Sequence, residues 1–304
     1  MQQWARQPIF WSALMVLVGF SLLTPLQLIT VHFIMVPIVM MMALSHTVWQ
    51  FALYFGIPAL LLLVSSGLAW PITAAVLVLM LVPGALVGYY YRKGSSAVTV
   101  MTAGITAMIG VLLLFLIAIS MSGINIQMEL KTAVQEQLEI FERITGQAVM
   151  SEEVLNSLLD VTMRLLPLYI IVIAFYYTVI THVVSRRLLG KLGVPAKALP
   201  PVHEWRLPRS LIWYYLIVLV LDFFVQRESG FYTLIMNVQT ILLFTFAVQG
   251  IAFLFFWAHM KKRSRALPVT GAVLCLLFPP AMYLMSMVGL IDTAFPIRNY
   301  MGKK

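Results

Sequence analysis

The sequence has very little charge and a single cysteine. Only 10% of its 304 residues are charged, against about a quarter in soluble domains. Cys275 stands alone in an apolar segment, which excludes a disulfide framework. With 62% hydrophobic residues, a soluble domain would leave much apolar surface in water, whereas a bilayer accepts it. The composition therefore indicates an integral membrane protein.

Motifs that carry chemistry are also missing. There is no GxxxxGK[ST] phosphate loop, no HExxH, no GxSxG, and the five histidines lack metal-ligand spacing. We therefore predict no enzymatic activity, no metal and no cofactor, so that any energy would come from a separate ATPase. The net charge of +9 does not indicate nucleic acid binding, because the basic residues lie in short loops between apolar runs.

Apolar runs long enough to cross about 30 Å of hydrocarbon predict an all-α polytopic transmembrane bundle. The count is eight or nine spans, because the first two runs are short and share a tight joint at Thr24-Pro25. We divide the single membrane domain into an N-terminal bundle (1–122), an extracytoplasmic helical loop (123–160) and a C-terminal bundle (161–304). The candidate spans are 8–23, 26–44, 48–64, 69–91, 97–121, 162–184, 210–225, 231–258 and 267–291.

The basic loops predict the orientation. Arg6 and the loops at 92–93, 186–209 and 261–265 hold 13 of the 20 Lys and Arg residues on one side, and the loop at 123–160 holds seven of the 11 acids on the other. Short basic loops stay in the cytoplasm, so the N-terminus is predicted inside. The side of the C-terminus stays open. Nine spans place Arg298, Lys303 and Lys304 outside, unless Pro279-Pro280 turns the last run into a hairpin.

The acidic loop is predicted to form two helices. Apolar residues recur at helical spacing up to Thr145, Gly146 interrupts the pattern, and Ser151 before Glu152-Glu153 is typical of a helix start. Two interpretations remain open. The helices either cover the outer mouth of the bundle or lie on the membrane surface as an amphipathic element.

Polar residues inside the spans are candidate ligand contacts, since they are costly in lipid and usually face an interior or a cavity. His32, Asp222, Asn237 and Gln239 all fall in the outer half of the predicted bilayer. Asp222 has an alternative, which is to reach water or pair with Arg227. Asn237 and Gln239 are two apart and point to different faces, so at most one need line the same cavity. Gln249 is expected to make an interhelical hydrogen bond.

Small residues four apart form two close-packing faces, Gly84 with Gly88 and Ala103 with Ala107. They either hold the two neighbouring spans together or dock another membrane subunit. The proline-rich loop 190–209 either docks a partner or lies on anionic lipid.

Two stretches carry a family resemblance, Glu204-Trp205-Arg206-Leu207-Pro208 and the tail from Gly289 to Arg298. With the helix layout, they resemble the YybS-like family of bacterial multi-pass membrane proteins. That resemblance implies a bacterial plasma membrane location and no known catalytic residues. The first six or so spans are more loosely similar to S components of energy-coupling-factor transporters. Such S components are six-helix bundles with an outward-facing pocket, docked on a separate coupling subunit.

The sequence thus favours a binding or transport subunit for an unknown small molecule, with no chemistry of its own. The alternative is a membrane scaffold or regulatory protein that recruits a partner. At the chain end, Asp292 and Arg298 are expected to pair only if the helix breaks at Phe295-Pro296, because residues six apart lie on different helix faces.

Overall fold

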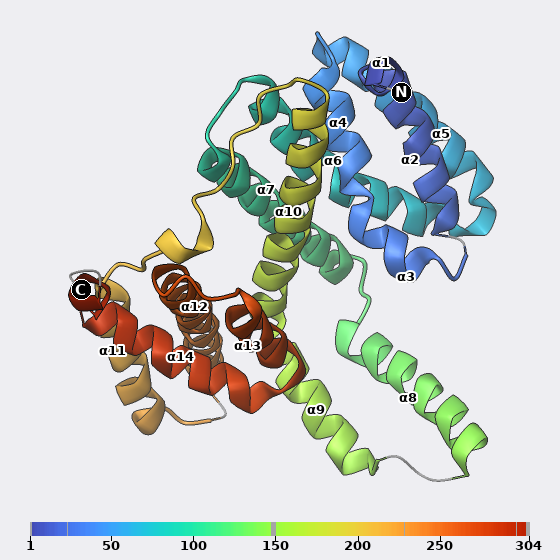
Figure 1. Ribbon diagram of the computed structural model, residues 1–304. Helices are drawn as coiled ribbons and strands as arrows, with labels where there is room; N and C mark the ends of the chain where they lie inside the picture. Colours follow the sequence, from blue (N-terminus) through green and yellow to red (C-terminus); the bar gives the residue numbers. More distant parts are fainter. Residues whose placement is uncertain (1, 23, 147–149, 228, 296, 302–304) are drawn as a thin grey trace. The chain divides into compact units, whose positions relative to one another are not determined.

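The computed structural model describes residues 2–22, 24–146, 150–227, 229–295 and 297–301. In these ranges the chain forms helices joined by loops, with no strand (Figure 1), so the all-α prediction is confirmed. The chain divides into two compact units. Unit 1 holds residues 1–149 and 169–199, and unit 2 holds residues 150–168 and 200–304. Pro296, Lys303 and Lys304, which enter the predictions above, lie outside the described residues.

Unit 1 is built around one buried helix. In α4 (Met35–Leu44) the residues from Met35 to Ala43 are all buried, as expected of a helix that is apolar on every side. The helices packed around it and beside it are α2 (Pro8–Ser21), α3 (Gln27–Thr30), α5 (Val48–Ser65), α6 (Trp70–Arg92), α7 (Ala97–Met121) and most of α10 (Leu166–Lys191).

The two small-residue faces do not meet each other. A side chain on Gly88 would collide with the carbonyl of Val39 in α4, and one on Gly84 would be in tight contact with Ile38. In α7 the close contact is made by Gly104, which meets Val87 of α6 and Thr178 of α10. The Gly84–Gly88 face therefore packs on α4 inside unit 1, whereas Ala103 and Ala107 are half-buried beside Gly104.

Unit 2 is organised by α12 (Gly230–Met260), with α11 (Ser210–Phe224), α13 (Ala266–Leu277) and α14 (Pro279–Ala294) beside it. Helices α12 and α14 cross at Gly250 and Gly289, where a side chain on either glycine would collide with the opposing backbone. Around this crossing Gly250 also faces Met285, Gly289 faces Phe246, and the Gln249 amide bonds to Asp292.

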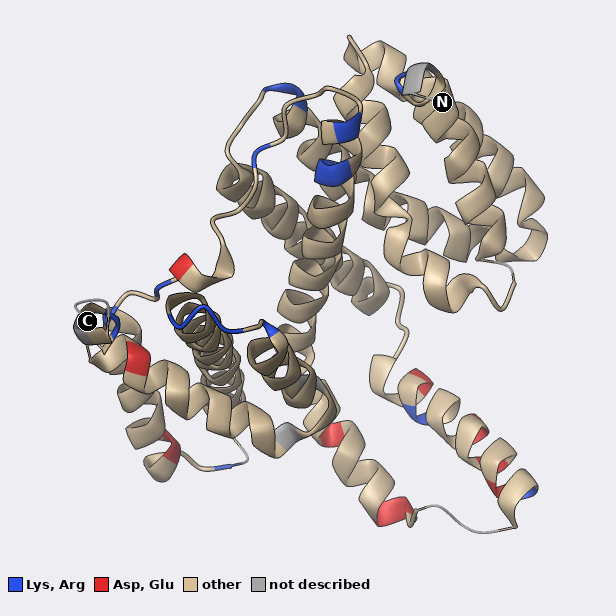
Figure 2. Cartoon of the chain, in the orientation of Figure 1, with Lys and Arg blue, Asp and Glu red and all other residues tan. Residues whose placement is uncertain are grey.

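The last apolar run is divided in two. Helix α13 ends at Leu277 and α14 begins at Pro279, with extended backbone at Phe278 between them. Arg298, near the chain end, lies beside Phe253 and Phe256 of α12, toward the end that bears the basic loop Lys261–Arg265 (Figure 2). The break has the position that the hairpin requires, and the side of the membrane on which the chain ends stays a prediction.

In the part of the chain that the structure describes, six helical segments are long and apolar enough to cross a membrane, and α2, α11 and the first part of α13 are shorter apolar helices. The count of eight or nine spans stays a prediction. The acidic loop forms α8 (Ile126–Thr145) and α9 (Glu152–Arg164), as predicted. Gly146 ends α8 in the left-handed conformation, and the Ser151 hydroxyl caps α9 by accepting from the N–H of Val154. Acidic residues lie along both helices (Figure 2).

The predicted boundaries at 122 and 160 differ from the observed division. Helix α10, assigned above to the C-terminal bundle, packs almost entirely within unit 1, and α8 and α9 belong to different units. The reason lies in a polar face of α10. Thr178, Thr181, His182 and Ser185 are buried there, and His182 Nδ1 lies 2.7 Å from the hydroxyl of Tyr91 in α6.

Candidate functional site

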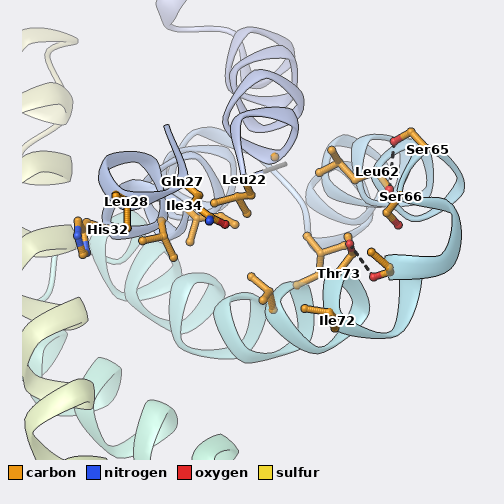
Figure 3. A pocket seen from close by; sticks show the side chains of 15 residues that line it. Leu22, Gln27, Leu28, His32, Ile34, Leu62, Ser65, Ser66, Ile72 and Thr73 are labelled. Carbon is orange, nitrogen blue, oxygen red and sulfur yellow. Dashed lines mark hydrogen bonds between the residues drawn. The ribbon is translucent and has the colours of Figure 1, made fainter. Parts of the chain in front are cut away.

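Unit 1 contains an apolar pocket of about 430 Å³ at the ends of its helices (Figure 3). It lies where α2 ends, α3 begins, α5 ends and α6 begins, which is the end of α6 opposite Arg92. The volume falls in the range of small-molecule sites, about 300–1,000 Å³. The lining residues are Gly19, Leu22, Gln27, Leu28, Val31, His32, Ile34, Leu62, Ser65, Ser66, Ala69, Ile72, Thr73, Val76 and Leu77.

Few polar groups line this pocket, and most of them are already engaged. The hydroxyls of Ser65, Ser66 and Thr73 donate to backbone carbonyls of their own segments, so each keeps only acceptor capacity for a ligand. His32 Nδ1 lies 3.1 Å from the Tyr176 hydroxyl of α10, which leaves its Nε2 free to exchange a hydrogen bond. Gln27 offers an amide. The pocket therefore suits a largely apolar molecule with one or two uncharged polar groups.

Of the four predicted ligand contacts, His32 alone lines this pocket. The other three belong to unit 2. Asp222 is half-buried near the end of α11, and no ion pair with Arg227 occurs among the described residues. Gln239 is half-buried on α12. Helix α8 contributes no lining residue, and the predicted lid over an outer pocket has no support within unit 1.

Asn237 forms hydrogen bonds with the backbone where α9 ends and α10 begins. Pro167, at the start of α10, stands between Arg164 and Leu168, whose carbonyl and N–H would pair in a continuous helix. The Asn237 side-chain amide forms hydrogen bonds with both groups instead. Its Oδ1 accepts from Leu168 N–H at 3.0 Å, and its Nδ2 donates to the Arg164 carbonyl at 2.7 Å. This bonding accounts for a buried asparagine without any ligand.

Replacing Asn237 by alanine is expected to lower the stability of the protein by about 1–3 kcal/mol, because two backbone groups lose their partner in a buried site. The matched control is Gln239→Ala on the same helix, which should stay within about 0.5 kcal/mol of the wild type. Thermal unfolding of the detergent-solubilised protein measures both. Equal midpoints for the two variants would contradict this role of Asn237.

A second constellation lies in unit 2 and is centred on a buried ion pair. Arg298 Nη2 lies 2.6 Å from Asp292 Oδ2, and both side chains are less than 5% exposed. The turn at Phe295, which has extended backbone, allows the two to meet across six residues. The Gln249 amide donates to the same carboxylate at 2.6 Å, which is the interhelical bond expected of it. Arg298 Nη1 also donates to the His203 carbonyl at 2.9 Å.

A small pocket of about 100 Å³ opens beside this ion pair. It brings together the two stretches that carried the family resemblance, the Trp-Arg-Leu-Pro loop and the chain end. Its lining is mixed, with three arginines and other polar residues beside Leu207 and Phe295. The lining residues are Arg206, Leu207, Arg209, Gln249, Asp292, Thr293, Phe295, Arg298 and Asn299.

Sequence reasoning missed the buried polar face of α10. The side chain of His182 is 2% exposed and stacked on Tyr91. Three hydroxyls beside it, those of Thr178, Thr181 and Ser185, have no hydrogen-bond partner among the described residues. Their spacing along one face of a helix was a visible signal, but Tyr91, the partner of His182, is 91 residues away. No group of three or more metal-ligating side chains occurs in the described part of the chain.

The fold and these sites define a multi-pass helical membrane protein. Residues 12–293 match the family described as "Predicted membrane protein (DUF2232)", and the chain belongs to that family. It is 25% identical over 223 residues to a protein named "Uncharacterized protein YybS" from Bacillus subtilis (strain 168), covering 71% of this chain and 72% of that protein. No solved structure matches. These comparisons agree with the YybS-like resemblance and do not extend to S components.

Proposed function

We propose that this protein is a membrane subunit that binds a small, largely apolar molecule in the pocket of unit 1 and performs no chemistry of its own. The observation that carries the proposal is the pocket itself, an apolar cavity of ligand size with polar groups only at a few points. The binding end lies opposite Arg92-Lys93 within unit 1, so the basic loops predict that it faces outward.

The helix content of unit 1 supports this role. Its described part packs six apolar segments, α2, the run from α3 to α4, α5, α6, α7 and α10, and S components are bundles of six helices. Movement of the bound molecule would require energy from a partner subunit, since the chain has no phosphate-binding loop. A bacterial plasma membrane with the N-terminus in the cytoplasm is the setting this proposal assumes.

The scaffold role has less support. It relies on basic cytoplasmic loops and on small-residue faces that dock another protein. Gly84 and Gly88 are covered by α4 inside the same unit. A partner would have to use the half-buried Ala103 and Ala107, or the basic loops.

Filling the pocket tests the proposal. Thr73→Phe places a ring in the cavity and is expected to abolish ligand retention, which native mass spectrometry of gently extracted protein reads directly. Val78→Phe on the same helix is the matched control, since Val78 is 50% exposed and does not line the pocket. A small molecule bound to the wild type and the control and lost from Thr73→Phe supports the proposal. Wild-type protein without any bound small molecule, or equal retention by both variants, contradicts it.

A further inference from the structure

The small pocket of unit 2 has an excess of positive charge. Arg298 is neutralised by Asp292, and the Gln249 amide donates to Oδ2 of that carboxylate, the oxygen that also accepts from Arg298 Nη2. Arg206 and Arg209 are different, because their side chains make no ion pair and no hydrogen bond among the described residues, although both line the cavity. Two arginines without an ionic partner among the described residues therefore line one pocket, together with Asn299.

The ion pair fixes the shape of this pocket. Asp292 holds Arg298 through Nε and Nη2, and Arg298 Nη1 holds the His203 carbonyl of the loop. The loop and the chain end are thus tied together around the cavity. One N–H on each of Nη1 and Nη2 is left over, because a guanidinium carries five donors and these bonds use three. These bonds leave donors of a buried, oriented arginine available to a further acceptor.

The position of the pocket along α12 indicates the level of the membrane at which its ligand would bind. Gln249 lies about 29 Å along the helix from Gly230, at 1.5 Å per residue. That distance is close to the hydrocarbon thickness of about 30 Å. If α12 enters the hydrocarbon at Gly230, the pocket lies at the opposite headgroup level, which the basic loops predict to be cytoplasmic.

We infer that this pocket binds a phosphate group through Arg206, Arg209 and the remaining donors of Arg298. Guanidinium groups recognise phosphate by paired, charge-assisted hydrogen bonds. The volume of about 100 Å³ admits a small ionic group and not a whole metabolite. The phosphate belongs to an anionic lipid headgroup or to a soluble phosphate compound, and basic pockets at the cytoplasmic ends of membrane helices suit the former. This site is independent of the apolar pocket of unit 1.

The test compares two variants that each remove two charges. Arg206→Gln/Arg209→Gln removes the free arginines of the pocket. Lys261→Gln/Arg265→Gln removes two charges from the next basic loop of unit 2, which does not line the pocket. The full-length protein, stripped of lipid in detergent, is titrated with phosphatidylglycerol and with phosphatidylcholine of the same chains, and bound lipid is counted by native mass spectrometry. Inorganic phosphate is titrated separately and as a competitor.

We expect the pocket variant to weaken binding of the phosphate ligand by about 30-fold, since each basic residue at an anionic surface contributes about fivefold, and the control to match the wild type. Preference for phosphatidylglycerol without competition by inorganic phosphate identifies a lipid headgroup. Saturable phosphate binding with no lipid preference identifies a soluble compound. Absence of both from the wild type, or equal losses in the two double variants, overturns the inference. Asn299→Asp, which adds a negative charge, should weaken binding in the same way if the double variant fails to fold.

Discussion

Gly289→Ala is expected to destabilise the protein by about 3 kcal/mol or more. The added methyl group would collide with the carbonyl of Phe246 on α12, and backbone cannot move aside as a side-chain end does. Helix α14 would have to shift away from α12, which would also stretch the bond from Gln249 to Asp292. Overpacking usually costs about 1–3 kcal/mol, and more where the neighbour is rigid.

Gly110→Ala is the control for this prediction. Gly110 lies in the middle of α7, and nothing comes within 4 Å of an added Cβ, so the higher helix propensity of alanine should stabilise the protein by up to about 1 kcal/mol. The same chemical change thus has opposite signs at the two glycines. Thermal unfolding in detergent separates them, and a Gly289→Ala midpoint at or above that of the wild type would show that α12 and α14 do not cross at this contact.

Asp292→Asn is expected to cost about 3–5 kcal/mol, because it leaves the Arg298 guanidinium buried without a counter-charge. Both side chains are less than 5% exposed, so water cannot solvate the guanidinium in place of the lost carboxylate. Asp160→Asn is the matched control. Asp160 pairs with Arg164 one helical turn away but is 56% exposed, and an exposed pair of this kind contributes about 0.5 kcal/mol or less.

The double variant Asp292→Asn/Arg298→Gln measures the interaction between the two charged side chains separately from the other effects of each substitution. It removes both buried charges together, so its loss of stability should be smaller than the sum of the losses in Asp292→Asn and Arg298→Gln, by a coupling energy of about 1 kcal/mol or more. Unfolding midpoints of the four proteins complete the cycle. Additive losses would mean that the two groups do not interact, and the tie between loop and chain end would have to be abandoned.

The sequence was sufficient for those features that depend on neighbours along the chain. Helix ends follow from local chemistry, as at Gly146 and Ser151. The pairing of Asp292 with Arg298 required only a break in the helix between them, and Phe295 provides it.

Features that depend on distant neighbours were beyond the sequence. His32 was a candidate because it is polar within an apolar run, but the pocket it lines is formed by α5 and α6. Asn237 is also polar within an apolar run, but its role is structural, since its amide bonds to backbone groups about 70 residues earlier. A polar residue within a span indicates that it has a partner, and only the fold says whether that partner is backbone, another side chain or a cavity.

We propose that the apolar pocket of unit 1 opens outside the cell and, for unit 2 taken by itself, that the basic pocket faces the cytoplasm. Replacing Cys275 by serine gives a cysteine-free chain, to which Leu68→Cys, next to the pocket, or Ser264→Cys, in the basic loop, is added. Both positions are exposed. In intact cells a membrane-impermeant maleimide should label Leu68→Cys, and it should label Ser264→Cys only after the membrane is opened. Labelling of Ser264→Cys in intact cells, with Leu68→Cys protected, would contradict the account.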